Sequence, residues 1–143
     1  MARVKVELPP HFSFSTTIPV RITDINHGGH VGNDTLLSII HEARVQFLKK
    51  YGYEELQFAG VGLIMSDVAI EFKNESFYGD HILVSVAAAE FSKVAFELYY
   101  KLEKTNGDNT LLIAVAKTGM VCYDYNRKKV ASVPAEAVKK LTS

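Results

Sequence analysis

The residues most able to do chemistry lie together in one short segment, residues 24–34, which reads DINHGGHVGND. Two histidines, two aspartates and two asparagines share its eleven positions with three glycines. Histidine exchanges a proton near neutral pH, so His30 is a candidate acid or base. Asn26 can orient a water molecule but cannot accept its proton. Because glycine lets a ligand approach the backbone closely, the segment favours attack by water on a bound substrate.

A helix is predicted directly after this segment, and its first turn would face the same place. Apolar residues recur at helical spacing over residues 33–53, and Asn33 or Asp34 is expected to cap the helix. The first N–H groups of a helix have no intrahelical partner and carry the positive end of the helix dipole. The N–H groups of Gly32 and Asn33 are therefore candidate donors to a ligand oxygen that carries negative charge.

The rest of the chain is predicted to form antiparallel strands around this helix. The expected strands are residues 15–25, 62–76, 81–91, 93–104 and 109–125. Asn106-Gly107 is typical of a hairpin turn, and Pro134 marks the start of a short C-terminal helix. No repeat or linker divides the 143 residues. We expect a single α+β domain in which about five strands wrap around one long central helix.

The composition excludes several classes of function. Sixteen basic and sixteen acidic residues give a net charge of zero, so no nucleic-acid partner is expected. Cys122 is the single cysteine, which excludes an internal disulfide and a cysteine-rich metal site. The chain has neither the apolar core of a secretory signal near residue 1 nor an apolar run of membrane-spanning length. A cytoplasmic protein without a membrane partner is the expectation.

Two stretches resemble a known family. The segment DINHGGHVGND followed by IIHEARVQFL is similar to an Asp, a short linker, GHVNN and a helix with EEAR. Further on, VAIEFKNESFYGD is similar to a strand and turn that read IxFLKPARxGD. Both patterns are typical of hotdog-fold acyl-CoA thioesterases of the 4-hydroxybenzoyl-CoA thioesterase-like family. The resemblance covers roughly residues 12–141.

The resemblance implies hydrolysis of an acyl thioester, carried on coenzyme A or acyl carrier protein, to free acid and thiol. It implies a homodimer whose two sheets join edge to edge, or a dimer of dimers, with substrate at the interface. It implies no metal and no redox cofactor, since coenzyme A belongs to the substrate. Lys73 is a candidate contact for the phosphates of coenzyme A.

The resemblance leaves the catalytic acid open. Members of the family often carry an Asp where this chain has Asn26. Plant acyl-carrier-protein thioesterases, which also resemble the chain, have a His that falls on His30 and a Glu that falls on Glu75. Some hotdog thioesterases instead use a carboxylate on the central helix, where this chain has Glu42. The candidate catalytic residues are therefore Asn26, His30, Glu42 and Glu75.

Three alternatives to hydrolysis are considered from the same residues. An enoyl-CoA hydratase or dehydratase of the same fold would need a His three residues after Asn26, and this chain has His30 one residue later. A non-catalytic acyl-thioester binding protein is favoured by Asn26 standing where an acid is usual. A zinc hydrolase using His27 and His30 is disfavoured, because these residues lie on a glycine loop without an evident third ligand.

Overall fold

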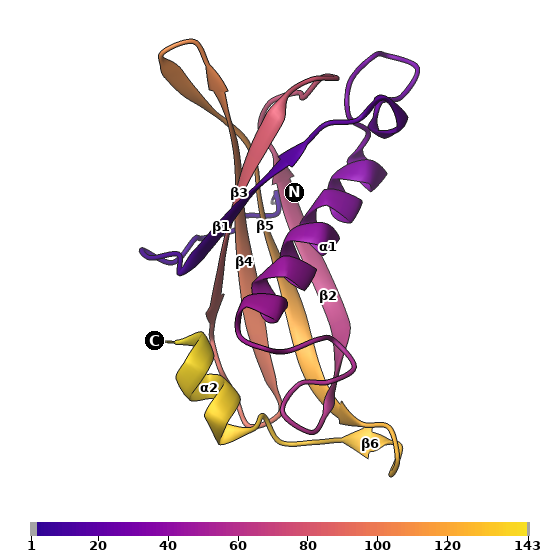
Figure 1. Ribbon diagram of the computed structural model, residues 1–143, viewed down its shortest axis with the longest axis vertical. Coiled ribbons are helices and arrows are strands. Elements are labelled where there is room, and N and C mark those ends of the chain that lie inside the picture. Colours follow the sequence, from indigo (N-terminus) through magenta and orange to yellow (C-terminus); the bar gives the residue numbers. More distant parts are fainter. Residues whose placement is uncertain (1–2, 143) are drawn as a thin grey trace.

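The computed structural model describes residues 3–142, which form one six-stranded sheet and two α-helices (Figure 1). The strands are β1 (Phe14–Pro19), β2 (Gly62–Phe72), β3 (His81–Ala89), β4 (Ala95–Asn106), β5 (Asn109–Asp124) and β6 (Lys129–Val130). The helices are α1 (Asn33–Lys50) and α2 (Ala135–Leu141), with a 3-10 turn, η1 (Ile22–Asp24), before α1. The expected α+β class, with a long helix and a short C-terminal helix, is confirmed.

The sheet is antiparallel, in the order β1-β3-β4-β5-β2, and the short β6 also pairs with β5. Strands β3, β4 and β5 follow one another through tight turns. The β4–β5 turn contains Gly107 at a φ of 66°, as the hairpin signal indicated. The two edge strands, β1 and β2, flank the long helix in the sequence, so α1 must cross the sheet to join them.

Helix α1 lies lengthwise across one face of the sheet (Figure 1). Its side chains Ile40, Ala43, Phe47 and Leu48 are fully buried. Strands β3, β4 and β5 contribute the opposite wall of this core, with residues such as Val84, Leu98 and Ile113. The broad apolar surface of the predicted helix thus faces the sheet, and this packing fixes where the first turn of α1 lies.

The start of α1 differs slightly from expectation. The N-cap residue is Gly32, one residue before the expected Asn33, and it offers no side-chain cap. The helix ends at Lys50, and Gly52 just after it adopts a φ of 82°, a conformation that glycine tolerates best and that is typical of a helix stop. Within residues 3–142, neither helix is long and apolar enough to cross a membrane.

Strand β1 is shorter than expected. Its pairing with β3 ends at Pro19, and a 3-10 turn replaces the predicted strand over residues 22–24. The buried Asp24 caps this turn: its carboxylate accepts the Arg21 N–H at 2.8 Å and pairs with the Arg21 guanidinium at 3.2 Å. Burial raises the pKa of Asp24, but the Arg21 hydrogen bonds outweigh it and the pKa lies below its ordinary value. Asp24 therefore caps a turn and does not share a strand face with Asn26.

The N-terminal segment packs against a second, smaller apolar cluster. Val6 is buried there with Tyr99 and Val115, and its N–H donates to the Glu71 carboxylate at 2.6 Å. Successive residues of a strand face opposite sides of the sheet. Tyr100 faces the main core, so Tyr99 lies on the other face of β4. The sheet is thus covered on part of its outer face as well.

Candidate active site

One cleft opens beside the first turn of α1, with a volume of about 230 Å³. It lies between the start of α1, the end of β2 and the turn that follows β2. The lining residues are His30, Val31, Gly32, Asn33, Leu36, Phe72, Lys73, Asn74, Glu75, Ser76 and Ile113. Five of the residues singled out in the sequence therefore meet in one cavity: His30, Gly32, Asn33, Lys73 and Glu75.

A short backbone ladder holds His30 at this cleft. His30 pairs with Phe77 in an isolated antiparallel bridge, and the Val31 N–H donates to the Ser76 carbonyl at 2.8 Å. The glycine loop is thereby tied to the turn after β2. This pairing brings residues 30 and 75, which are far apart in the sequence, to the same cavity.

The ring of His30 is oriented by the backbone carbonyl of the next residue, Val31. Its Nδ1 lies 3.3 Å from the Val31 carbonyl oxygen, and a carbonyl only accepts, so the proton of the neutral ring belongs on Nδ1. Nε2 is then the basic nitrogen, 4.0 Å from the Glu75 carboxylate. The imidazole and the Glu75 carboxylate form an ion pair only after Nε2 gains a proton. Glu75 can therefore stabilise the imidazolium that forms when His30 acts as a base.

The first turn of α1 presents hydrogen-bond donors to the cleft. The helical ladder begins with the Leu36 N–H, which donates to the Gly32 carbonyl at 3.0 Å. The amides before it lie outside that ladder, and Gly32 provides no side-chain cap for them. Gly32 and Asn33 both line the cleft. The arrangement can therefore bind a developing negative charge on a substrate oxygen.

Asn26 lies beside the cleft, where two glycines make room for it. Its Oδ1 accepts the Gly28 N–H at 2.9 Å, and its Nδ2 would be 3.8 Å from a Cβ placed on Gly32. A Cβ on Gly28 would come within 3.1 Å of His30 Nε2. The absence of side chains at both glycines thus keeps the imidazole and the amide group uncovered.

The turn after β2 is fixed by Lys104. Its ammonium group donates to the Asp80 carboxylate at 2.7 Å and to the Glu75 carbonyl at 3.0 Å. Burial raises the pKa of Asp80, but the hydrogen bonds from Lys104 and from the Phe77 N–H hold it below its ordinary value. A wider groove continues from the cleft along this turn, and Lys73 and Glu75 line both.

Glu42 does not share the cleft with His30. It lies in a separate groove between α1 and β1, where Asp24 is also found, and its carboxylate accepts the Gln46 side-chain N–H at 2.7 Å. Within one copy of the chain, Glu75 is therefore the carboxylate placed beside the imidazole.

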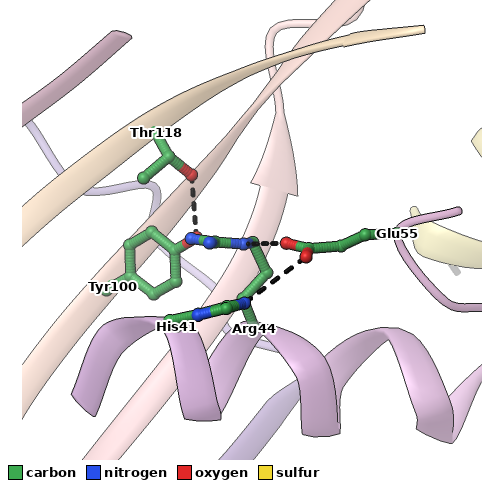
Figure 2. Close-up of polar contacts among 5 residues, drawn as sticks. All are labelled: His41, Arg44, Glu55, Tyr100 and Thr118. Atoms are coloured by element: carbon green, nitrogen blue, oxygen red, sulfur yellow. Dashed lines mark hydrogen bonds and ion pairs between the residues drawn. The ribbon is translucent and has the colours of Figure 1, made fainter. Parts of the chain in front are cut away.

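Arg44, two residues after Glu42 on α1, belongs to a different cluster (Figure 2). Its Nε–H donates to Glu55 at 2.6 Å, and its guanidinium lies 3.4 Å from the Tyr100 hydroxyl. His41 approaches the same carboxylate at 3.4 Å, and Tyr100 bonds to the buried Thr118 at 2.7 Å. This cluster joins α1 to the loop after it and to β4 and β5.

Other reactive side chains do not reach the cleft. Cys122 is buried in β5, and burial raises the pKa of its thiol to about 11, so it is not a thiolate near neutral pH. No group of three His, Cys, Asp or Glu residues within the described part of the chain could hold a metal ion.

Two polar residues of the cleft, Asn74 and Ser76, were not predicted from the sequence. Nothing in their sequence context indicated them, because their place beside the cleft depends on the pairing of residues 30 and 77. The apolar part of the lining, Leu36, Phe72 and Ile113, was expected only as core or strand.

Known proteins are similar to this chain over most of its length. The family profile described as the Thioesterase-like superfamily matches residues 20–141. A relative, the 1,4-dihydroxy-2-naphthoyl-CoA hydrolase of Nostoc punctiforme, is 26% identical over 130 residues, which cover 89% of this chain and 85% of that protein.

Solved structures show the same fold. A 1,4-dihydroxy-2-naphthoyl-CoA thioesterase from Synechocystis matches with a TM-score of 0.79 and 24% identity, covering 91% of this chain and 98% of that one. The 4-hydroxybenzoyl-CoA thioesterase of Pseudomonas sp. strain CBS-3 matches with a TM-score of 0.78 and 18% identity, covering 90% and 99%. The hotdog fold expected from the sequence is confirmed.

Proposed function

The chain belongs to the thioesterase-like superfamily, and we propose that it hydrolyses acyl-CoA thioesters in the cleft beside His30. One observation carries the assignment of the site: the uncapped start of α1 and the imidazole line the same cavity. Donors for an oxyanion and a base for water are the two requirements of thioester hydrolysis.

In the proposed reaction, the thioester carbonyl oxygen accepts hydrogen bonds from the N–H groups of Gly32 and Asn33. Water oriented by Asn26 adds to the carbonyl carbon, and His30 Nε2 takes the water proton. The tetrahedral intermediate then loses the sulfur: the C–S bond breaks, and Nε2 returns the proton to the thiolate. Glu75 stabilises the imidazolium. The scheme uses no metal or other cofactor, and Lys73 at the cleft mouth faces the phosphates of coenzyme A.

We propose an aromatic acyl group as the preferred substrate. The relative and the two solved structures described above are named for naphthoyl and benzoyl thioesters. The apolar lining of this cleft, Val31, Leu36, Phe72 and Ile113, surrounds a volume of about 230 Å³, which suits a ring better than a long alkyl chain. Thiol release from benzoyl-, naphthoyl-, butyryl- and palmitoyl-CoA tests both proposals. We expect the highest kcat/KM for the aromatic esters, and no release from any ester would contradict hydrolysis.

Asn26→Asp tests the role of the amide. The change restores the acid usual in the family, so we expect kcat to stay equal or to rise by up to about tenfold. Asn26→Ala is the matched control, and it should lower kcat because water loses its orienting group. A large loss of kcat in Asn26→Asp would show that the N–H donors of the amide are required.

We also propose a homodimer formed through β2. Within residues 3–142 this strand pairs only with β5, so its outer edge is unpaired. Ile64, Met65, Val68 and Phe72 on β2 are exposed, as is Leu37 on α1. A long apolar edge of this kind is a site for pairing with a second strand. Antiparallel pairing of two copies would extend the sheet and place a second α1 beside each cleft.

Val68→Lys tests this interface. Val68 lies near the middle of β2, where a two-fold axis would bring it close to its copy, so two lysines would repel and remain poorly solvated. We expect a shift from dimer to monomer at micromolar concentration, measured by light scattering after size-exclusion chromatography. Val130→Lys is the control. Val130 is an exposed residue of β6, which pairs with β5 on the side opposite β2, so this change should leave the dimer intact. A wild-type monomer would contradict the interface.

A further inference from the structure

Ser76 is a buried polar residue without a partner. Its exposed fraction is 2%, and among the described residues its hydroxyl oxygen is the one buried side-chain N or O atom that forms no hydrogen bond. A buried hydroxyl without a hydrogen bond costs stability, and such groups in native proteins are uncommon. Its position in the cleft lining suggests what the hydroxyl binds.

The backbone around Ser76 places it next to the helix start. Its carbonyl accepts the N–H of Val31, the residue before the N-cap Gly32. Ser76 and Val31 are both buried, whereas Phe77 and His30 on either side are more exposed. Ser76 therefore lies on the inner wall of the cleft, and His30 and Glu75 lie towards its mouth. Gly32 and Asn33, at the uncapped start of α1, line the same cavity as Ser76.

We propose that the Ser76 hydroxyl donates a hydrogen bond to the thioester carbonyl oxygen, as a third donor beside the N–H groups of Gly32 and Asn33. This inference rests on the proposed hydrolysis. An oxygen that gains negative charge in the transition state binds a donor more strongly than the neutral ester does. The hydroxyl can be left without a partner in the free protein because substrate supplies one, and its burial keeps it fixed in place.

This role predicts opposite effects on stability and on catalysis. Ser76→Ala removes an unsatisfied buried hydroxyl, so it should raise Tm, by about 3 °C. The same variant loses a transition-state donor, so kcat should fall at least about tenfold while KM changes less than about threefold. A serine with a merely structural role would not combine a gain in Tm with a loss of kcat.

The experiment compares Ser76→Ala and Ser76→Cys with wild type in a thiol-release assay and by thermal unfolding. Cysteine nearly keeps the volume of serine but donates a weak hydrogen bond, so we expect Ser76→Cys to lose kcat as Ser76→Ala does. Ser85→Ala is the matched control. Ser85 is also buried in the sheet, but it does not line the cleft, so kcat should stay within about twofold of wild type.

Two results would overturn the role of Ser76: an unchanged kcat in Ser76→Ala, or a fall in both kcat and Tm.

A separate binding measurement distinguishes failure of the Ser76 role from failure of the proposed hydrolysis. Benzoyl-CoA with a methylene group in place of sulfur keeps the carbonyl oxygen and cannot be hydrolysed. Calorimetry should show that this neutral ketone binds Ser76→Ala up to about threefold more weakly than wild type, in line with the small change in KM, even if wild type releases no thiol. Equal affinities would exclude the hydrogen bond.

Discussion

His30→Ala is expected to lower kcat for acyl-CoA hydrolysis at least about 100-fold, with KM changed less than about threefold. The imidazole is the group in the cleft that can take a proton from water and return it to the leaving sulfur. Its Nδ1 bonds to the Val31 carbonyl, which leaves Nε2 as the base. Thiol release at saturating acyl-CoA measures kcat, and unfolding by urea verifies that the variant is folded.

His27→Ala is the matched control for this prediction. His27 belongs to the same loop but is exposed and does not line the cleft, so its replacement should leave kcat within about twofold of wild type. A His30→Ala variant that kept more than a tenth of the wild-type kcat would contradict the assignment. The base would then have to be a carboxylate, and Glu75→Gln would become the decisive variant.

The main elements of the fold could be predicted from the sequence because local patterns determine them. Apolar spacing over residues 33–53 predicted α1, and β-branched runs separated by glycine and asparagine turns predicted β2 to β5. The end of β1 could not be predicted, since the run of β-branched residues continues past Pro19. There the capping of a turn by Asp24 competes with strand pairing, and only the packed structure shows which prevails.

The site was predictable to the extent that it is local in sequence. Gly32, Asn33 and His30 follow one another along the chain, so a helix start after a glycine loop brings them together. The roles of Ser76 and Glu55 were not predictable, because each depends on a contact between distant segments. Arg44 illustrates this limit: its neighbour Glu42 is two residues away, yet the guanidinium pairs with Glu55 across the loop after α1.

Glu55→Ala is expected to destabilise the protein by about 3 kcal/mol. The Arg44 side chain is 8% exposed, and Glu55 is the carboxylate that its guanidinium contacts, at 2.6 Å (Figure 2). Removing Glu55 would leave a buried positive charge with only the Tyr100 hydroxyl, 3.4 Å away, as a neighbour. Urea unfolding at a fixed protein concentration measures the loss from the shift of the midpoint.

Glu97→Ala provides the comparison for an ion pair that remains solvated. Its carboxylate also lies 2.6 Å from its partner, Lys117, but that lysine side chain is 32% exposed. Solvent screens the pair, so we expect a loss of at most about 1 kcal/mol. If Glu55→Ala lost no more stability than Glu97→Ala, burial of Arg44 could not be what makes its ion pair important.

The contribution of Glu55 should also depend on pH. Burial raises its pKa, but the hydrogen bond and charge of Arg44 outweigh burial and hold the pKa below its ordinary value. A carboxyl group whose folded pKa is lowered stabilises the fold above its unfolded pKa, and this stability is lost as pH falls through the folded pKa. The difference in unfolding free energy between wild type and Glu55→Gln should therefore be constant near pH 7 and shrink below about pH 4.

The double variant Arg44→Met/Glu55→Gln separates the charge from the packing. Replacing both members of a buried ion pair by uncharged side chains of similar size is often neutral, because no unpaired charge remains. The Tyr100 hydroxyl keeps its 2.7 Å bond to Thr118 without the guanidinium, so no new unsatisfied group is created there. We expect the double variant to recover most of the stability lost in Glu55→Gln alone. If it were no more stable than that single variant, the loss would come from the loop after α1 and not from the unpaired guanidinium.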